Sequence, residues 1–146
     1  MIQDSHQFYQ KRLAISVEEI NRIEQLILLI QRLDSNFQPD TYFISDYLIG
    51  EEREWKHLYF FSIQKMWIAH KFQSVVELES IPFVNQDTYP VQISAKSFDM
   101  VTYNEKSRFS ATIQVEKNQI ELKATQANCM VLLDVLRRFF IQRNVV

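Results

Sequence analysis

The side chains of this chain that could perform acid–base or metal chemistry are few and scattered. Histidine occurs three times, as His6, His57 and His70, and the single cysteine is Cys129. A structural zinc site needs four ligands at characteristic spacing, and the sequence contains neither a CxxC nor an HxxH pair. We therefore expect no metal site in this chain.

Two glutamates form the best candidate for paired carboxylates. Glu77 and Glu79 alternate with apolar residues, which predicts that both lie on one strand face, about 7 Å apart. Paired carboxylates can carry acid–base catalysis, but no base, nucleophile or oxyanion donor accompanies them in sequence. The solvated side of a strand is the preferred interpretation. Cys129 falls on the apolar side of a helical pattern, where a thiol is typically buried and inert. We predict no catalytic residues.

Glycine, which lets a backbone fold closely around a phosphate, occurs only once in 146 residues, at Gly50. The chain therefore has no Gly-rich nucleotide loop, no dinucleotide-binding fingerprint and no nucleophile elbow. These absences exclude many enzyme classes at once. We expect no cofactor and favour a non-enzymatic protein.

The composition is that of a single globular domain covering residues 1–146, with 47% hydrophobic and 23% charged residues. A net charge of −2 gives no field to attract nucleic acid. The longest apolar run, residues 26–30, is far shorter than the roughly 20 residues of a membrane span. One unpaired cysteine fits a reducing compartment. We expect a soluble, cytoplasmic protein with no nucleic-acid partner and no membrane span.

Amphipathic helices are predicted near both ends of the chain, at about 16–34 and 125–143. Ser16 and Glu19 have the spacing of a capping box at the start of the first helix. Its apolar residues form two adjacent stripes at helical spacing: Ile20, Ile23, Ile27 and Ile30, and then Leu26, Leu29 and Leu33. So wide an apolar surface indicates two neighbours, of which one is the sheet of the same chain and the other could be a partner chain.

The region between the helices, about 41–124, is predicted to form antiparallel strands. Segments 109–115 and 120–124 alternate apolar and polar residues on either side of a hairpin at 116–119. Further strands are expected near 41–48, 57–63, 65–72, 75–81, 91–96 and 98–103, with a tight turn near Gln64. An amphipathic helix over 51–63 is the alternative.

This order of elements predicts an α+β fold. A curved antiparallel sheet or half-barrel of five to seven strands would lie between an N-terminal and a C-terminal amphipathic helix. A doubly wound parallel sheet is excluded because it needs long crossovers between strands. The order is similar to that of pleckstrin-homology-like domains, in which one amphipathic helix closes the open end of meandering strands. The resemblance carries no motif and implies an arrangement rather than a function.

Aromatic residues concentrate between Trp55 and Phe72, on both alternating faces of the chain. A strand buried on both sides explains this pattern if helix 16–34 covers the second face. An exposed aromatic patch would instead mark a partner site. The candidate interface residues are Ile23, Ile27, Ile30, Trp55, Tyr59, Phe61 and Trp67.

Three functions stay open. The favoured one is a non-enzymatic cytoplasmic binding domain that acts through a protein surface and forms a homo-oligomer through helix 16–34. The second is a partner-specific immunity protein or a secretion-chaperone-like protein, which small size and mild acidity fit. The third is a small-ligand binder or enzyme that uses the concave face of the sheet, where His57, His70, Glu77 or Glu79 would meet in a pocket.

Overall fold

The computed structural model describes residues 2–45, 57–70, 76–83, 92–102, 104–115 and 117–141, and the structural statements below concern these residues. Two helices, α1 (Ile2–Leu13) and α2 (Val17–Leu33), precede the strands. After the strands, α3 (Asn128–Val135) continues into a π-helical segment, η1 (Leu136–Ile141). The fold is α+β, as predicted, with one more N-terminal helix than expected.

The seven described strands form two separate antiparallel sheets. Sheet A has the order β1 (Thr41–Ile44), β2 (His57–Phe61), β3 (Lys65–His70) and β4 (Glu77–Pro82), and sheet B has the order β5 (Gln92–Phe98), β6 (Arg108–Val115) and β7 (Asn118–Thr125). Within each sheet the strands pair antiparallel in chain order, as predicted. They divide into two sheets between β4 and β5 instead of forming one curved sheet or half-barrel, and no barrel closes among the described strands. Alternation within a strand predicts its two faces but not which strands pair.

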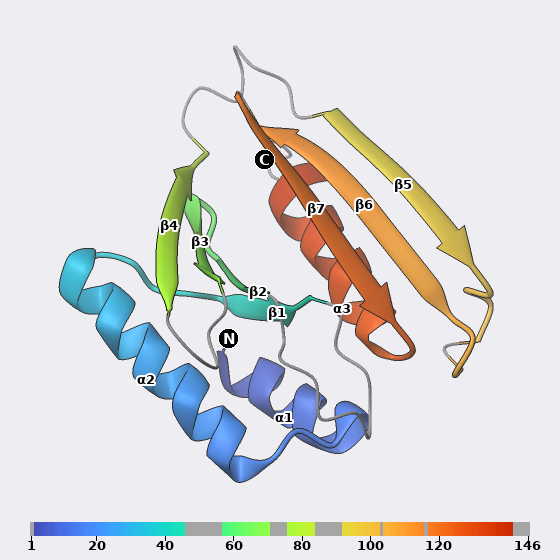
Figure 1. Ribbon diagram of the computed structural model, residues 1–146, viewed down its shortest axis with the longest axis horizontal. Coiled ribbons are helices and arrows are strands. Elements are labelled where there is room, and N and C mark those ends of the chain that lie inside the picture. Colours follow the sequence, from blue (N-terminus) through green and yellow to red (C-terminus); the bar gives the residue numbers. More distant parts are fainter. Residues whose placement is uncertain are drawn as a thin grey trace.

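Sheet A lies in the middle of the molecule, between α1 and α2 on one face and sheet B with α3 on the other (Figure 1). Successive residues of β1 and β2 point alternately into the cores on the two faces of sheet A. Tyr42 and Phe60 belong to the core beneath the N-terminal helices, whereas Phe43, Tyr59 and Phe61 belong to the core shared with sheet B. The prediction of a strand buried on both sides, with helix 16–34 over the second face, is confirmed for residues 57–61.

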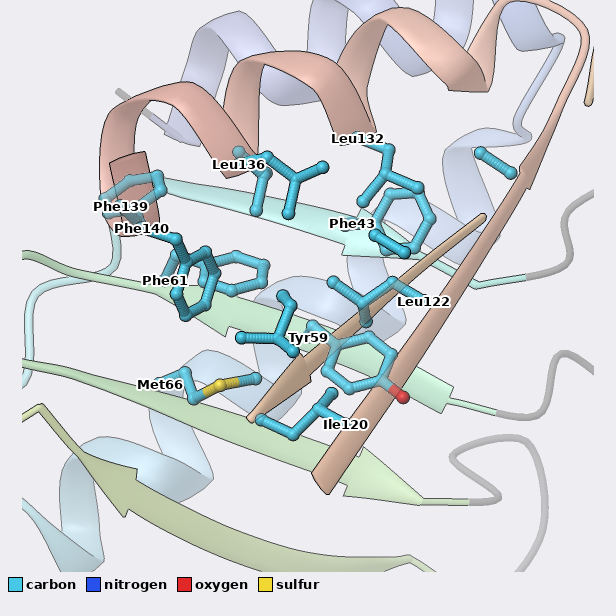
Figure 2. Close-up of a cluster of buried hydrophobic side chains, with 14 of the residues drawn as sticks. Phe43, Tyr59, Phe61, Met66, Ile120, Leu122, Leu132, Leu136, Phe139 and Phe140 are labelled. Atoms are coloured by element: carbon cyan, nitrogen blue, oxygen red, sulfur yellow. The ribbon is translucent and has the colours of Figure 1, made fainter. Parts of the chain in front are cut away.

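The C-terminal helix fills the angle between the two sheets. Figure 2 shows Leu132, Leu136, Phe139 and Phe140 lying over side chains of sheet A, with Ile120 and Leu122 of β7 completing the core. The ring of Phe61 stacks on Phe139 with centroids 5.4 Å apart. Full burial of such a side chain stabilises the fold by about 1.5–3 kcal/mol, so this cluster holds the sheets together.

Helix α2 begins and ends close to where the sequence predicts. The Ser16 hydroxyl accepts a hydrogen bond from the Glu19 backbone N–H at 3.2 Å, as an N-cap should. Ile15 and Ile20, on either side of the cap, are buried in one cluster as in a hydrophobic staple.

Helix α1 was not predicted, because its buried face is largely polar. Ser5, His6, Tyr9 and Leu13 point inward, and only the last is a purely apolar side chain. The helix ends without glycine: Ala14 takes the left-handed conformation with φ 55°, and the Ile15 N–H then turns back to bond the Tyr9 carbonyl at 3.2 Å.

Three other expectations differ from the structure. The C-terminal helix begins at Asn128 rather than near 125, because β7 continues to Thr125 and Gln126 then turns with φ 56°. The separate strand expected near 98–103 does not form over 99–102, since β5 ends at Phe98 and Asp99 turns with φ 50°. The helical alternative for 51–63 is wrong for 57–61, which is strand β2, while residues 51–56 lie outside the described ranges.

Candidate functional site

Most of the predicted interface residues lie in the cores of their own chain. Ile23, Ile27 and Ile30 face sheet A, and Tyr59 and Phe61 face sheet B and α3. Trp67 is half-buried, and its indole N–H donates to the Asp34 carboxylate at 3.2 Å. Trp55 lies outside the described residues. The isoleucine stripe is therefore occupied by the chain itself.

The second apolar stripe of α2 is not covered in the same way. Leu26 is buried, but Leu29 is 40% exposed and Leu33 is 64% exposed. We call these two residues the Leu29–Leu33 ridge. Glu18 and Arg32 are exposed near the two ends of the same helix. The wide apolar surface predicted from the sequence thus divides into a covered stripe and an open ridge.

Two histidines that are distant in sequence meet across sheet A. His57 of β2 is the direct cross-strand partner of His70 of β3, and their Nδ1 atoms are 2.9 Å apart. On the far side of its ring, His70 Nε2 lies 3.1 Å from Glu79 Oε2. Because one Nδ1 must donate and the other accept, the two rings share a single proton in this contact.

This cluster unites three of the four residues that the third sequence hypothesis named. The fourth, Glu77, lies opposite His70 in the β3–β4 register. A signal in the sequence could have located the histidine pair. A tight turn near Gln64 pairs residues at equal distances from its centre, and His57 and His70 are such a pair for a turn centred between Ile63 and Gln64.

A cavity of about 350 Å³ opens between α1, the start of β1 and α3. Its apolar wall includes Phe8 and Met130, and its rim includes the side chains of Asp4, Asp134 and Arg138. Arg138 binds Asp134 at 3.2 Å and also Asp40 at 2.9 Å. These ion pairs join α3 to the segment before β1, which gives the charged rim a structural role.

Cys129, His6 and Tyr42 are titratable groups that lie buried within the fold. Cys129 is buried in the core between the sheets, where burial raises the pKa of its thiol. This burial agrees with the prediction that Cys129 lies on the buried side of its helix.

His6 lies between the Tyr42 hydroxyl, 2.8 Å from Nδ1, and Glu24, 2.6 Å from Nε2. Burial raises the pKa of Tyr42 above its usual value, so its phenol stays protonated beside His6.

Within the described ranges, no group of three or more His, Cys, Asp or Glu side chains is arranged to hold a metal ion. None of the helices in that part of the chain is long and apolar enough to cross a bilayer. Comparison with known proteins finds no match to a protein-family model, to a curated protein or to a solved structure.

Proposed function

We propose that this chain is a non-enzymatic binding domain that self-associates through α2. The observation that carries the proposal is the division of the apolar surface of α2. The isoleucine stripe is buried in the chain, whereas the adjacent Leu29–Leu33 ridge is open to solvent. Contiguous exposed apolar residues on one helix face are typical of an interaction surface.

The charges of α2 support a second copy of the same chain as the partner. The helix is 17 residues long, or roughly 25 Å at 1.5 Å per residue. It carries Glu18 in its first turn and Arg32 in its last turn. In an antiparallel pair related by a twofold axis, Glu18 of one copy would face Arg32 of the other, and Leu33 would then lie opposite the exposed Val17 of the other copy. Antiparallel helix dipoles also favour this pairing.

The proposal is tested by comparing the oligomeric mass of the Leu33→Glu variant in solution with that of the wild-type chain. We expect the wild-type chain to be a dimer and Leu33→Glu to be a monomer with unchanged helix content. Leu28→Glu is the matched control, because Leu28 is 60% exposed on the same helix but lies about 140° around its axis from Leu33. The control should remain a dimer.

Size-exclusion chromatography with light scattering over a range of concentrations gives the mass. A wild-type chain that is monomeric throughout would refute the proposal, and so would equal dissociation by the two glutamate substitutions. Ile23→Glu, the obvious choice from sequence alone, is unsuitable because Ile23 is fully buried and the charge would unfold the chain.

A pleckstrin-homology-like arrangement is part of the same proposal. It is supported by the order of four strands, three strands and a C-terminal helix, with α1 and α2 added on the outer face of sheet A. This arrangement does not identify a ligand.

The unpaired, buried Cys129 fits a reducing compartment, so we place the domain in the cytoplasm. An immunity-protein or chaperone-like role would replace the second copy with a different protein on the same ridge.

A small-ligand site on sheet A is a second candidate, favoured by the contacts that join His57, His70 and Glu79. A ligand bound there would shift the NMR signals of both imidazole rings and leave those of His6 in place. Signals that stay unchanged during binding would place the ligand elsewhere. This candidate is independent of self-association, because the three residues lie on sheet A rather than on α2.

A further inference from the structure

We propose that His57 and His70 form a chelate site for a divalent transition metal ion, with Glu79 orienting His70 from the far side of its ring. The inference names a ligand class for the small-ligand candidate and does not depend on self-association through α2. It reverses the expectation of no metal site, which rested on the scattered positions of the histidines in the sequence.

The two nitrogen atoms already lie close to the separation that a shared metal ion needs. Zinc binds imidazole nitrogen at about 2.0–2.1 Å, and tetrahedral geometry then places two ligand nitrogens about 3.3 Å apart. His57 Nδ1 and His70 Nδ1 are 2.9 Å apart. The two nitrogens need to separate by about 0.4 Å, and each ring must turn by roughly 35° so that its Nδ1 lone pair points at the ion rather than at the other ring.

Glu79 lies where a metal-binding histidine needs its hydrogen-bond acceptor. When a metal ion occupies both Nδ1 atoms, the proton of each neutral ring is on Nε2. The Nε2–H of His70 then donates to Glu79 Oε2, which lies 3.1 Å away. Such a carboxylate fixes the tautomer of the ligating histidine and raises its basicity. The ring whose Nδ1 donates in the metal-free contact transfers that proton to its own Nε2, and the other ring already carries its proton on Nε2, so the two neutral rings lose no proton overall.

The sheet holds this arrangement in place before any metal ion binds. His57 and His70 are directly opposite on adjacent antiparallel strands, and direct partners have Cβ atoms about 4.5–5.5 Å apart. The neighbouring Tyr59 and Ile68 are buried in the core between the sheets, which limits movement of the strands. A chelate built on paired strands therefore loses little conformational entropy on binding.

The site is also accessible and has a favourable charge. The His70 side chain is 27% exposed and that of Glu79 is 50% exposed, so an ion can enter and water can complete its coordination. Glu77 is the cross-strand partner of His70 and adds a second carboxylate on this face. With two imidazoles as the protein ligands in the described part of the chain, the metals that favour nitrogen, Cu²⁺ and Zn²⁺, are the ones expected to bind.

Calorimetric titration of the full chain with zinc chloride tests the inference. We expect one zinc ion per chain and at least a tenfold loss of affinity in both His57→Gln and His70→Gln. Glu79→Ala should weaken zinc binding by about tenfold or more while keeping both ligands. Glu121→Ala is the matched control, because Glu121 is a similarly exposed glutamate, on sheet B, that pairs with Lys123. It should bind zinc as the wild-type chain does.

Two outcomes would overturn the inference: no binding of zinc by the wild-type chain, or equal affinity in the wild-type chain and either histidine variant. If a histidine variant fails to fold, the wild-type chain decides the matter by NMR. Zinc must then shift the ring signals of His57 and His70 and leave those of His6 unchanged. Leu33→Glu should bind zinc normally, which separates a failure of this inference from a failure of self-association.

Discussion

Removal of the Tyr9 hydroxyl should destabilise the fold by more than the loss of one ordinary hydrogen bond. Tyr9 is fully buried. Its hydroxyl donates to Asn128 Oδ1 at 2.6 Å and accepts from the Ile44 backbone N–H at 2.9 Å. The Asn128 amide in turn donates to the Ile44 carbonyl at 2.7 Å. One hydroxyl therefore connects α1, β1 and α3.

The magnitude follows from the groups that Tyr9→Phe would leave without this partner. The Ile44 N–H and Asn128 Oδ1 both lose it inside the protein, and each buried group left unsatisfied costs about 1–3 kcal/mol. The aromatic ring remains and keeps its stacking on Tyr42, with centroids 5.2 Å apart. We expect a loss of about 3 kcal/mol in the free energy of unfolding. With a urea m value of about 2 kcal/mol/M, the unfolding midpoint should fall by about 1.5 M.

Urea unfolding followed by circular dichroism measures this loss. Tyr42→Phe is the matched control, because it removes a hydroxyl from the same ring stack and breaks the single contact with His6 Nδ1. Its expected cost is about 1 kcal/mol. In a double-mutant cycle, Asn128→Ala should lower the free energy of unfolding by less in the Tyr9→Phe variant than in the wild-type chain. A Tyr9→Phe variant within roughly 0.5 kcal/mol of wild type, the range of an ordinary surface substitution, would refute the reasoning.

Two further predictions concern a strained turn and an ion pair. Ala14→Gly should raise the free energy of unfolding by about 0.5–1 kcal/mol, because glycine removes the steric cost of the left-handed residue after α1. Urea unfolding measures this change, and a loss of stability would contradict the prediction. The Lys65 ammonium and the Trp67 indole N–H that donate to Asp34 hold the pKa of that carboxyl below its usual range. The stability advantage of wild type over Asp34→Asn should therefore be full at neutral pH, shrink below about pH 4 and vanish below the folded-state pKa. Thermal melts over a pH series measure it, and a constant difference down to about pH 2 would count against the assignment.

Local pattern was sufficient to predict several elements of this fold. The N-cap at Ser16 and the isoleucine stripe behind it predicted α2 nearly to its ends. Strict alternation on either side of 116–119 predicted the β6–β7 hairpin. These predictions succeed because capping, helical periodicity and strand alternation act between residues that are close in the chain.

Helix α1 shows where the same reasoning fails. Its buried side chains are mostly polar, and partners distant in the chain satisfy them: Ser5 bonds Thr41, His6 bonds Tyr42, and Tyr9 reaches Asn128. No apolar periodicity marks such a helix, because its stability comes from hydrogen bonds whose partners the local sequence does not contain.

By itself, the sequence determined α2, the C-terminal helix and most of the strands, but not α1. It also determined that α2 has more apolar surface than one neighbour can cover. Tertiary structure decided that Ile23 faces the core whereas Leu33 remains outside, and it placed His57 against His70. Pairing of strands into two sheets and packing of helices onto them depend on contacts between distant residues. A local pattern can indicate that a face is apolar, but only the assembled layers determine what covers it.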